Sequence, residues 1–155
     1  MSDIVSKMVE LANGATAWTP CMIGSEMIGS GTNIGALSHI GKKVKIGNDC
    51  RIQGSVYIAD GCMIGENVFI GPNATLTNDR YPPSGGVWSP VVVEDGVVIG
   101  ANSTIVAGVT LHEGCIIGAG TVVTTDIPNN QVWAGNPAQF LMYRDEYESK
   151  RERNE

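Results

Sequence analysis

The residues best suited to chemistry lie in one polar segment, residues 77–90, which is rich in Pro, Gly and Ser. Asn78, Asp79, Arg80 and Tyr81 follow one another there, and Trp88 comes near its end. An arginine matches phosphate through its planar fork, and aromatic rings stack on flat bases. The segment therefore predicts a contact set for a small molecule. Two alternatives remain open: an insertion without a role, and a Tyr81 that only shapes the turn before its two prolines.

A strict six-residue repeat surrounds this segment. Ile or Leu recurs every six residues from Ile28 to Leu76, and the series resumes in a new phase from Val93 to Val123. A second series of mostly small residues lies two positions before each of these, which places both series on one side of a short strand. Gly, Asn and Asp follow the large aliphatics and suit corners with positive φ. No 3.6-residue helix has this period, and a hairpin meander would not keep it.

Stacking of three such units per turn predicts an all-β fold, a parallel β-helix of about five triangular coils with 18 residues each. Between Leu76 and Val93 the chain advances 17 residues instead of six, so about 11 residues must leave the coil. Connections on a rigid scaffold frequently carry function. We therefore expect residues 77–90 to form a functional excursion loop.

The length of 155 residues predicts a single domain. We expect an N-terminal helical cap within 1–14, with a helix over 3–12, then the β-helix over 20–135. Residues 136–155 are expected to form a C-terminal helix and tail, with Asn136 as N-cap, Pro137 at the first helical position and the helix ending near residue 150. Caps are needed because an unpaired coil edge invites aggregation.

Composition excludes several classes of protein. The net charge of −6 and the pI near 4.8 argue against a nucleic-acid partner, which needs a basic patch. The sequence contains no stretch of 18 apolar residues, so it predicts no membrane span. The N-terminus does not resemble a secretory signal, and we therefore expect a cytoplasmic protein. Four cysteines without a CxxC pair, and two histidines, do not support a metal site. Cys50, Cys62 and Cys115 fall in the small inward series and are predicted to act as small hydrophobes.

Three stretches resemble the hexapeptide-repeat acyltransferases: the repeats, the coil 100–108, and the end formed by 117–128 with 134–138. The resemblance covers about residues 20–142. Within the family, the loop Leu76–Pro82 is most similar to that of N-acetyltransferases of nucleotide-linked amino sugars. The resemblance implies a left-handed β-helix, a homotrimer, and acetyl-CoA bound in grooves between neighbouring prisms without a metal.

The resemblance also implies which residues hold the cofactor. Small residues that let an extended pantetheine arm approach the backbone are Gly100, Ala101, Ala107, Gly118 and Ala119. Their alternative role is only to form the corners of the coils. Asn136, Pro137 and Gln139 would lie beside the adenine end, and family members often carry Lys or Arg at the position of Gln139.

The excursion loop favours an amine over a hydroxyl as acyl acceptor. O-acetyltransferases of this fold commonly place a catalytic histidine in the loop, because a hydroxyl nucleophile needs a general base. No histidine occurs between residues 77 and 90, and an amine attacks once it is neutral. We therefore expect acetyl transfer to a nucleotide-linked amino sugar, with Asn78 positioning the sugar or thioester and Asp79 accepting a proton or binding the ammonium.

The remaining candidates are assigned by the same hypothesis. Arg80, Tyr81 and Trp88 would hold the diphosphate and base of the nucleotide. His39 is the rival general base, whereas His112 is expected to be a solvated surface residue. The related γ-class carbonic anhydrases need three metal-binding histidines, which two histidines cannot supply. Alternatives that stay open are an O-acetyltransferase of a sugar or small alcohol and a non-catalytic β-helix scaffold.

Overall fold

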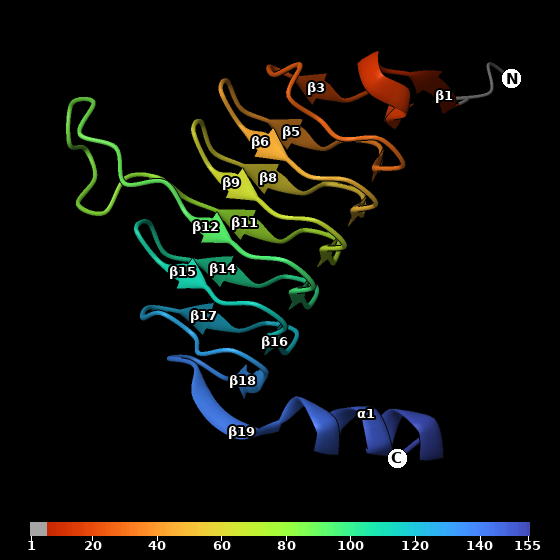
Figure 1. The fold of residues 1–155 in the computed structure, drawn as a ribbon. Coiled ribbons are helices and arrows are strands. Elements are labelled where there is room, and N and C mark those ends of the chain that lie inside the picture. The colour runs from red at the N-terminus through yellow and green to blue at the C-terminus, as the bar shows by residue number, and fades with distance from the viewer. Residues whose placement is uncertain (1–5) are drawn as a thin grey trace, which may run out of the picture.

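The chain winds into stacked triangular coils, as the computed structural model of residues 6–155 shows (Figure 1). Each coil contributes one short strand to each of three sheets, and consecutive coils pair in parallel. The first sheet contains β1 (Lys7–Glu10), β2 (Thr16–Thr19), β4 (Asn33–Ile34), β7 (Arg51–Ile52), β10 (Phe69–Ile70), β13 (Val98–Ile99), β16 (Ile116–Ile117), β18 (Gln131–Ala134) and β19 (Gln139–Tyr143).

The other two sheets form the remaining faces of the prism. The second sheet contains β3 (Met22–Ile23), β5 (His39–Ile40), β8 (Tyr57–Ile58), β11 (Thr75–Leu76), β14 (Thr104–Ile105) and β17 (Val122–Val123). The third sheet contains β6 (Lys45–Ile46), β9 (Met63–Ile64), β12 (Val92–Val93) and β15 (Thr110–Leu111). Coils that are complete in all three sheets run from β4 to β15, with partial coils at both ends. The predicted β-helix of about five coils is confirmed.

The interior is a stack of aliphatic side chains in register. Ile34, Ile52, Ile70, Ile99 and Ile117 lie above one another through the paired strands of the first sheet, and all are buried. Burying such a side chain contributes roughly 1.5–3 kcal/mol, as an upper bound. The period of the sequence is thus the period of the core.

Polar residues in the small inward series are buried but satisfied. The hydroxyls of Thr32, Ser38 and Ser103 donate to backbone carbonyls in the following coil, those of Gly47, Gln53 and Gly118, at 2.8, 3.0 and 3.0 Å. Buried polar groups are tolerated when they are hydrogen-bonded in this way. The same series holds Cys50, Cys62 and Cys115, which are buried as predicted.

The corners are tight because backbone lies directly on backbone. A Cβ added at Gly100 would lie 2.5 Å from the amide nitrogen of Ala119 in the following coil, and one at Gly71 would lie 2.6 Å from that of Ala101. Only glycine fits such a close approach. Gly100 therefore has a corner role, whatever else it does.

The excursion leaves the prism where the sequence predicts it. Phe69 pairs with Arg51 in the preceding coil and with Val98 in the following one, so one coil is 18 residues long and the next is 29. The extra residues emerge between β11 and β12, and they project from the stack as the green loop of Figure 1. The loop thus lies at the corner between the second and third sheets.

The predicted N-terminal helix is wrong within the described residues, and residues 3–5 of the prediction lie outside them. Lys7–Glu10 form strand β1, which pairs antiparallel with β2, and Ala12–Gly14 form a single 3-10 turn, η1. The outer edge of β2 exposes backbone groups that need partners. Strand β1 satisfies these groups by pairing with that edge. The hydrogen bonds so formed outweigh the weak helical preference of the N-terminal residues.

The predicted start of the C-terminal helix is also wrong. Residues 139–143 form β19, which pairs antiparallel with β18, and helix α1 spans Arg144–Arg153. Asn136 and Pro137 lie in the hairpin turn between the two strands and cap no helix. The free edge of β18 again explains the strand. The helix extends past residue 150, where a tail was expected, and ends at Arg153, with Asn154 as its C-cap in the left-handed conformation.

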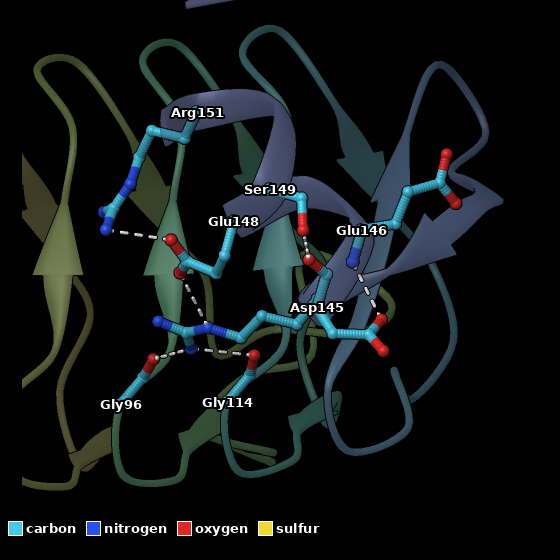
Figure 2. A network of polar contacts seen from close by, with 8 residues as sticks. Gly96, Gly114, Asp145, Glu146, Glu148, Ser149 and Arg151 are labelled. Atoms are coloured by element: carbon cyan, nitrogen blue, oxygen red, sulfur yellow. Dashed lines mark hydrogen bonds and ion pairs between the residues drawn. The ribbon is translucent and has the colours of Figure 1, made fainter. Parts of the chain in front are cut away.

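Arg144, the first residue of α1, attaches the helix to the corner between the third and first sheets, which we call the helix corner (Gly96, Gly114 and Asn130). Its Nη1 donates to the carbonyls of Gly96 and Gly114, at 2.7 and 2.9 Å, and its backbone amide donates to the carbonyl of Asn130. Its Nε bonds to Glu148, which also pairs with Arg151 (Figure 2). One side chain thus joins consecutive coils to the helix.

Within residues 6–155 no helix is long and apolar enough to cross a membrane.

Candidate active site

The excursion loop is closed at its base by Asn78. The backbone carbonyl of Asn78 accepts a hydrogen bond from the amide of Ser89, at 2.6 Å. Its side-chain Nδ2 donates to the carbonyl of Asp60, at 3.1 Å, in the preceding coil. The hydroxyl of Thr77 donates to the carbonyl of Ile105, at 3.0 Å, in the following coil. The base of the loop is therefore fixed to the coils on both sides.

Asp79 has one carboxylate oxygen held and one without a partner. Its Oδ2 accepts a hydrogen bond from the amide of Ser84, at 3.0 Å, whereas its Oδ1 is buried and accepts none. Within the described chain only Glu148 Oε2 shares this condition, and that atom lies 2.9 Å from the Nη2 of Arg151. Leaving a buried acceptor unsatisfied costs about 1–3 kcal/mol. Asp79 Oδ1 thus has an acceptor position that no described donor uses.

Arg80 lies beside Ala107, which the sequence assigned to a different group of candidates. Its Nη1 donates to the carbonyl of Ala107, at 3.0 Å. Ala107 lies at the same corner as the loop, between the second and third sheets. We call this corner, formed by 59–61, 77–90, 106–109 and 124–126, the loop corner. An open groove of about 410 Å³ lies here, lined by Arg80, Ser89, Ala107, Gly108, Val109, Thr124, Thr125 and Asp126.

The aromatic candidates lie on the outside of the loop. Tyr81 is 81% exposed and Trp88 is 53% exposed, and neither lines the groove beside Arg80. Val87 is exposed as well. The loop thus exposes apolar surface, and its two aromatic candidates lie outside the groove that Arg80 lines.

Four of the small cofactor candidates meet at the corner between the first and second sheets. Gly100 and Ala101 follow β13, and Gly118 and Ala119 follow β16 one coil later. The amide of Gly118 donates to the carbonyl of Trp133, at 2.9 Å. We call these four residues the small-residue corner.

The hairpin turn that holds the adenine candidates lies against this corner. The amide of Val122 donates to the carbonyl of Gly135, and the amide of Ala138 donates to that of Val122. Asn136, Pro137 and Gln139 therefore lie near the small-residue corner and are exposed. Ala107, in contrast, lies at the loop corner, so the predicted cofactor residues of one chain divide between two corners.

His39 lies on the second sheet at a distance from the loop. Its ring stacks on that of Tyr57, with 4.6 Å between the centroids and 18° between the planes. Tyr57 in turn pairs with Thr75, so β8 separates His39 from β11, where the loop begins. Two strand spacings correspond to about 9.6 Å. The structure therefore does not bring His39 together with Asn78 and Asp79.

Several contacts were missed from the sequence, although the period carries a signal for two of them. Asp60 lies 18 residues before Asn78, and Glu94 lies 18 residues before His112, whose Nδ1 is 3.1 Å from the Oε1 of Glu94. Residues one coil apart occupy neighbouring positions on the same corner or face. Ser84 and Ser89, which bond to the loop base, give no such signal.

Neither thiol chemistry nor a metal centre is supported. Burial raises the pKa of Cys62 to about 11 and that of Cys115 to about 12, and it also raises the pKa of Cys50. Because the thiolate is the nucleophile and the metal ligand, these cysteines are inert near neutral pH. No group of three or more His, Cys, Asp and Glu residues within 6–155 is arranged to hold a metal ion.

Comparisons with known proteins agree with the repeat. A family described as bacterial transferase hexapeptide (six repeats) matches residues 27–60 and 44–78, and a hexapeptide repeat of succinyl-transferase matches residues 90–125. The 2,3,4,5-tetrahydropyridine-2,6-dicarboxylate N-acetyltransferase of Staphylococcus aureus is 46% identical over 68 residues, which cover 44% of this chain and 27% of that protein.

Two solved structures share the fold. The acetyltransferase domain of PglB from Neisseria gonorrhoeae, in complex with acetyl coenzyme A, superposes with a TM-score of 0.70 at 21% identity, over 83% of this chain and 58% of that one. PerB from Caulobacter crescentus, in complex with CoA and GDP-perosamine, gives 0.66 at 24% identity, over 85% and 58%. The chain thus spans about a quarter of the curated relative and over half of these structures. From the repeat, its buried aliphatic stack and the two family matches, we conclude that the chain belongs to the hexapeptide-repeat transferases.

Proposed function

We propose that the chain is an acetyl-CoA-dependent acetyltransferase whose acceptor is the amino group of a nucleotide-linked amino sugar. The observation that carries this proposal is the buried Oδ1 of Asp79, which has no hydrogen-bond donor although the base of its loop is fixed to the coils. A carboxylate oxygen in that condition matches an ammonium or an amine that loses a proton.

The donor is proposed by analogy and from the corner geometry. The PglB domain binds acetyl coenzyme A and PerB binds CoA. Here the backbone at the small-residue corner would carry the pantetheine arm, with Asn136, Pro137 and Gln139 beside the adenine. Ala107, at the loop corner, would lie near the thioester. Because these sets occupy two corners of one prism, we propose a homotrimer in which a groove between neighbouring prisms joins the corner of one chain to the loop of the next.

The acceptor and the reaction follow from the loop. The amine nitrogen attacks the thioester carbonyl carbon, the carbon–sulfur bond breaks, and the CoA sulfur leaves as a thiolate that takes up a proton. Asp79 Oδ1 accepts the proton that the amine loses. Asn78 Nδ2 uses one N–H for Asp60 and keeps a second for the sugar or the thioester oxygen. Arg80, Tyr81 and Trp88 are proposed to face the diphosphate and base, because PerB binds GDP-perosamine, a nucleotide-linked amino sugar.

Steady-state acetyl transfer by Asn78→Ala and Asp79→Asn tests the proposal. We expect Asp79→Asn to lose at least about 100-fold in kcat, which is the usual contribution of a positioned base. Asp49→Asn is the matched control, because Asp49 lies at a corner remote in sequence from the loop and its positive φ suits asparagine. Unchanged turnover in both loop variants would refute the assignment.

Two further outcomes separate the alternatives. An O-acetyltransferase would acetylate a sugar hydroxyl and would depend on a general base, for which His39 is the candidate, so His39→Ala would abolish its activity. A catalytically silent scaffold would not be stabilised by CoA. At saturating CoA a binding protein gains stability by mass action, and we expect a rise in melting temperature.

Light scattering tests the proposed homotrimer. It should give a mass about three times the 16.4 kDa of one chain.

A further inference from the structure

We propose that Arg80 is a positioning residue, which holds Asp79 in place by fastening the excursion loop to the following coil. This role rests on the proposed function, in which Asp79 accepts the proton of the amine. It differs from binding a diphosphate, because it requires a side-chain donor at position 80 for the carbonyl of Ala107 and does not require a charged substrate.

Asp79 lies between two attachments that point to opposite neighbours in the stack. On one side, Asn78 Nδ2 donates to the carbonyl of Asp60 in the preceding coil. On the other side, Arg80 Nη1 donates to the carbonyl of Ala107 in the following coil. Residues 78–80 therefore bridge three consecutive coils, and Asp79 is the middle of that bridge.

The acceptor of Arg80 is well suited to hold a side chain still. Ala107 is completely buried and forms the corner between β14 and β15, so its carbonyl direction is fixed by the coil. The side chain of Arg80 crosses from the loop to this carbonyl along the groove lined by Ser89, Gly108 and Thr124. A guanidinium has five N–H donors in a rigid plane, and one of them is used here for the carbonyl of Ala107.

The rest of the loop has no comparable attachment. Asp79 Oδ2 bonds to the amide of Ser84, and the hydroxyl of Ser84 bonds to the carbonyl of Val87, so both contacts stay within the loop. Among the described hydrogen bonds of residues 80–88, the one from Arg80 to Ala107 is the only one that reaches a coil. Removing it leaves the segment after Asp79 tied to the prism only at the neck, Asn78 and Ser89.

Hydrogen exchange tests this without any substrate. Two backbone amides report on the loop. The amide of Ser84 donates to the carboxylate of Asp79, and the amide of Ser89 donates to the carbonyl of Asn78. We expect the Ser84 amide to exchange at least about tenfold faster in Arg80→Ala, because local opening sets its protection. Arg80→Lys, which keeps a donor, should restore most of that protection. Arg51→Ala, an exposed arginine of β7, is the matched control and should change neither amide.

Kinetics supply the second readout. Arg80→Ala should lower kcat at least about tenfold while the KM for the nucleotide sugar stays within about twofold, because a misplaced base affects the chemical step more than binding. A raised KM at unchanged kcat would overturn the proposal in favour of diphosphate binding alone. Unchanged exchange at Ser84 overturns it whatever the kinetics. If no nucleotide-linked amino sugar is acetylated by the wild-type chain, the proposed function fails, and the exchange experiment still decides the role of Arg80.

Discussion

Asp79 and the buried cysteines illustrate how environment assigns roles to single residues. Both kinds of side chain are ionisable, yet they lie in opposite settings. The Oδ1 of Asp79 is buried at the base of a polar loop with no donor, whereas Cys62 and Cys115 lie in the aliphatic stack. The carboxylate therefore has an unfilled bonding site, and the thiols fill space. The sequence distinguishes them because the cysteines follow the period of six and Asp79 interrupts it.

The thiols predict a loss of stability at alkaline pH. Burial raises the pKa of Cys62 to about 11 and that of Cys115 to about 12, above the ordinary value of 9.0. Between these values the unfolded chain has released the thiol protons while the native chain keeps them. The free energy of unfolding therefore falls as the pH rises above about 9, and the contribution of protonated burial is fully present only below that pH.

Urea denaturation at about pH 8 and about pH 10.5 measures this fall. The double variant Cys62→Ala/Cys115→Ala keeps every other titrating group, so its midpoint should drop less between the two values than that of the wild-type chain. Equal drops would show that the two thiols do not control the alkaline loss.

At the scale of elements, the strands of the periodic segments were predictable, whereas the elements at the two ends of the β-helix were not. Every strand from β4 to β17 follows from an aliphatic such as Ile52 repeated every six residues, because stacked coils repeat the same contact. The residues of strands β1 and β19 do not follow the period of six. They form because the outer edges of β2 and β18 need hydrogen-bond partners, and such open edges exist only once the coils have stacked.

The site divides in the same way. The excursion and its polar residues follow from the break in period, and the contact between Asn78 and Asp60 follows from their separation of one coil. Arg80 and Ala107 are 27 residues apart, a spacing that belongs to no repeat because the insertion lies between them. Their contact, like that of Asp79 with Ser84, depends on how the loop folds back and could not be predicted from the period.

The C-terminal helix should depend on Arg144 for its attachment. Arg144→Met keeps much of the side-chain length and removes the bonds to the carbonyls of Gly96 and Gly114 (Figure 2). Because hydrogen bonds that involve a charged group contribute about 1.5–3 kcal/mol each, we expect a loss of about 2–4 kcal/mol in urea denaturation followed by circular dichroism.

Arg151→Met is the matched control for that variant. Its guanidinium pairs only with Glu148 among the described contacts and its side chain is 69% exposed. An exposed pair of this kind contributes at most about 1 kcal/mol. Equal destabilisation by the two variants would contradict the role that we give to the helix corner.

At the scale of the whole molecule, the three corners of the prism carry three different tasks. At the small-residue corner backbone packs directly on backbone, the loop corner holds Asp79, and the helix corner joins the last coils to α1. One repeated unit supplies all three, because each coil passes every corner once. In the function that we propose, chemistry is added by a single interruption of the repeat between β11 and β12.

The measurement that tests the central claim most directly is mass spectrometry of the products formed from acetyl-CoA and a panel of nucleotide-linked sugars. Each amino sugar in the panel is paired with the analogue that has a hydroxyl in place of the amine. We expect an acetamide on at least one amino sugar, with release of CoA, and no product from its hydroxyl analogue. Acetylation of the hydroxyl analogues alone, or no transfer to any member of the panel, would contradict the account.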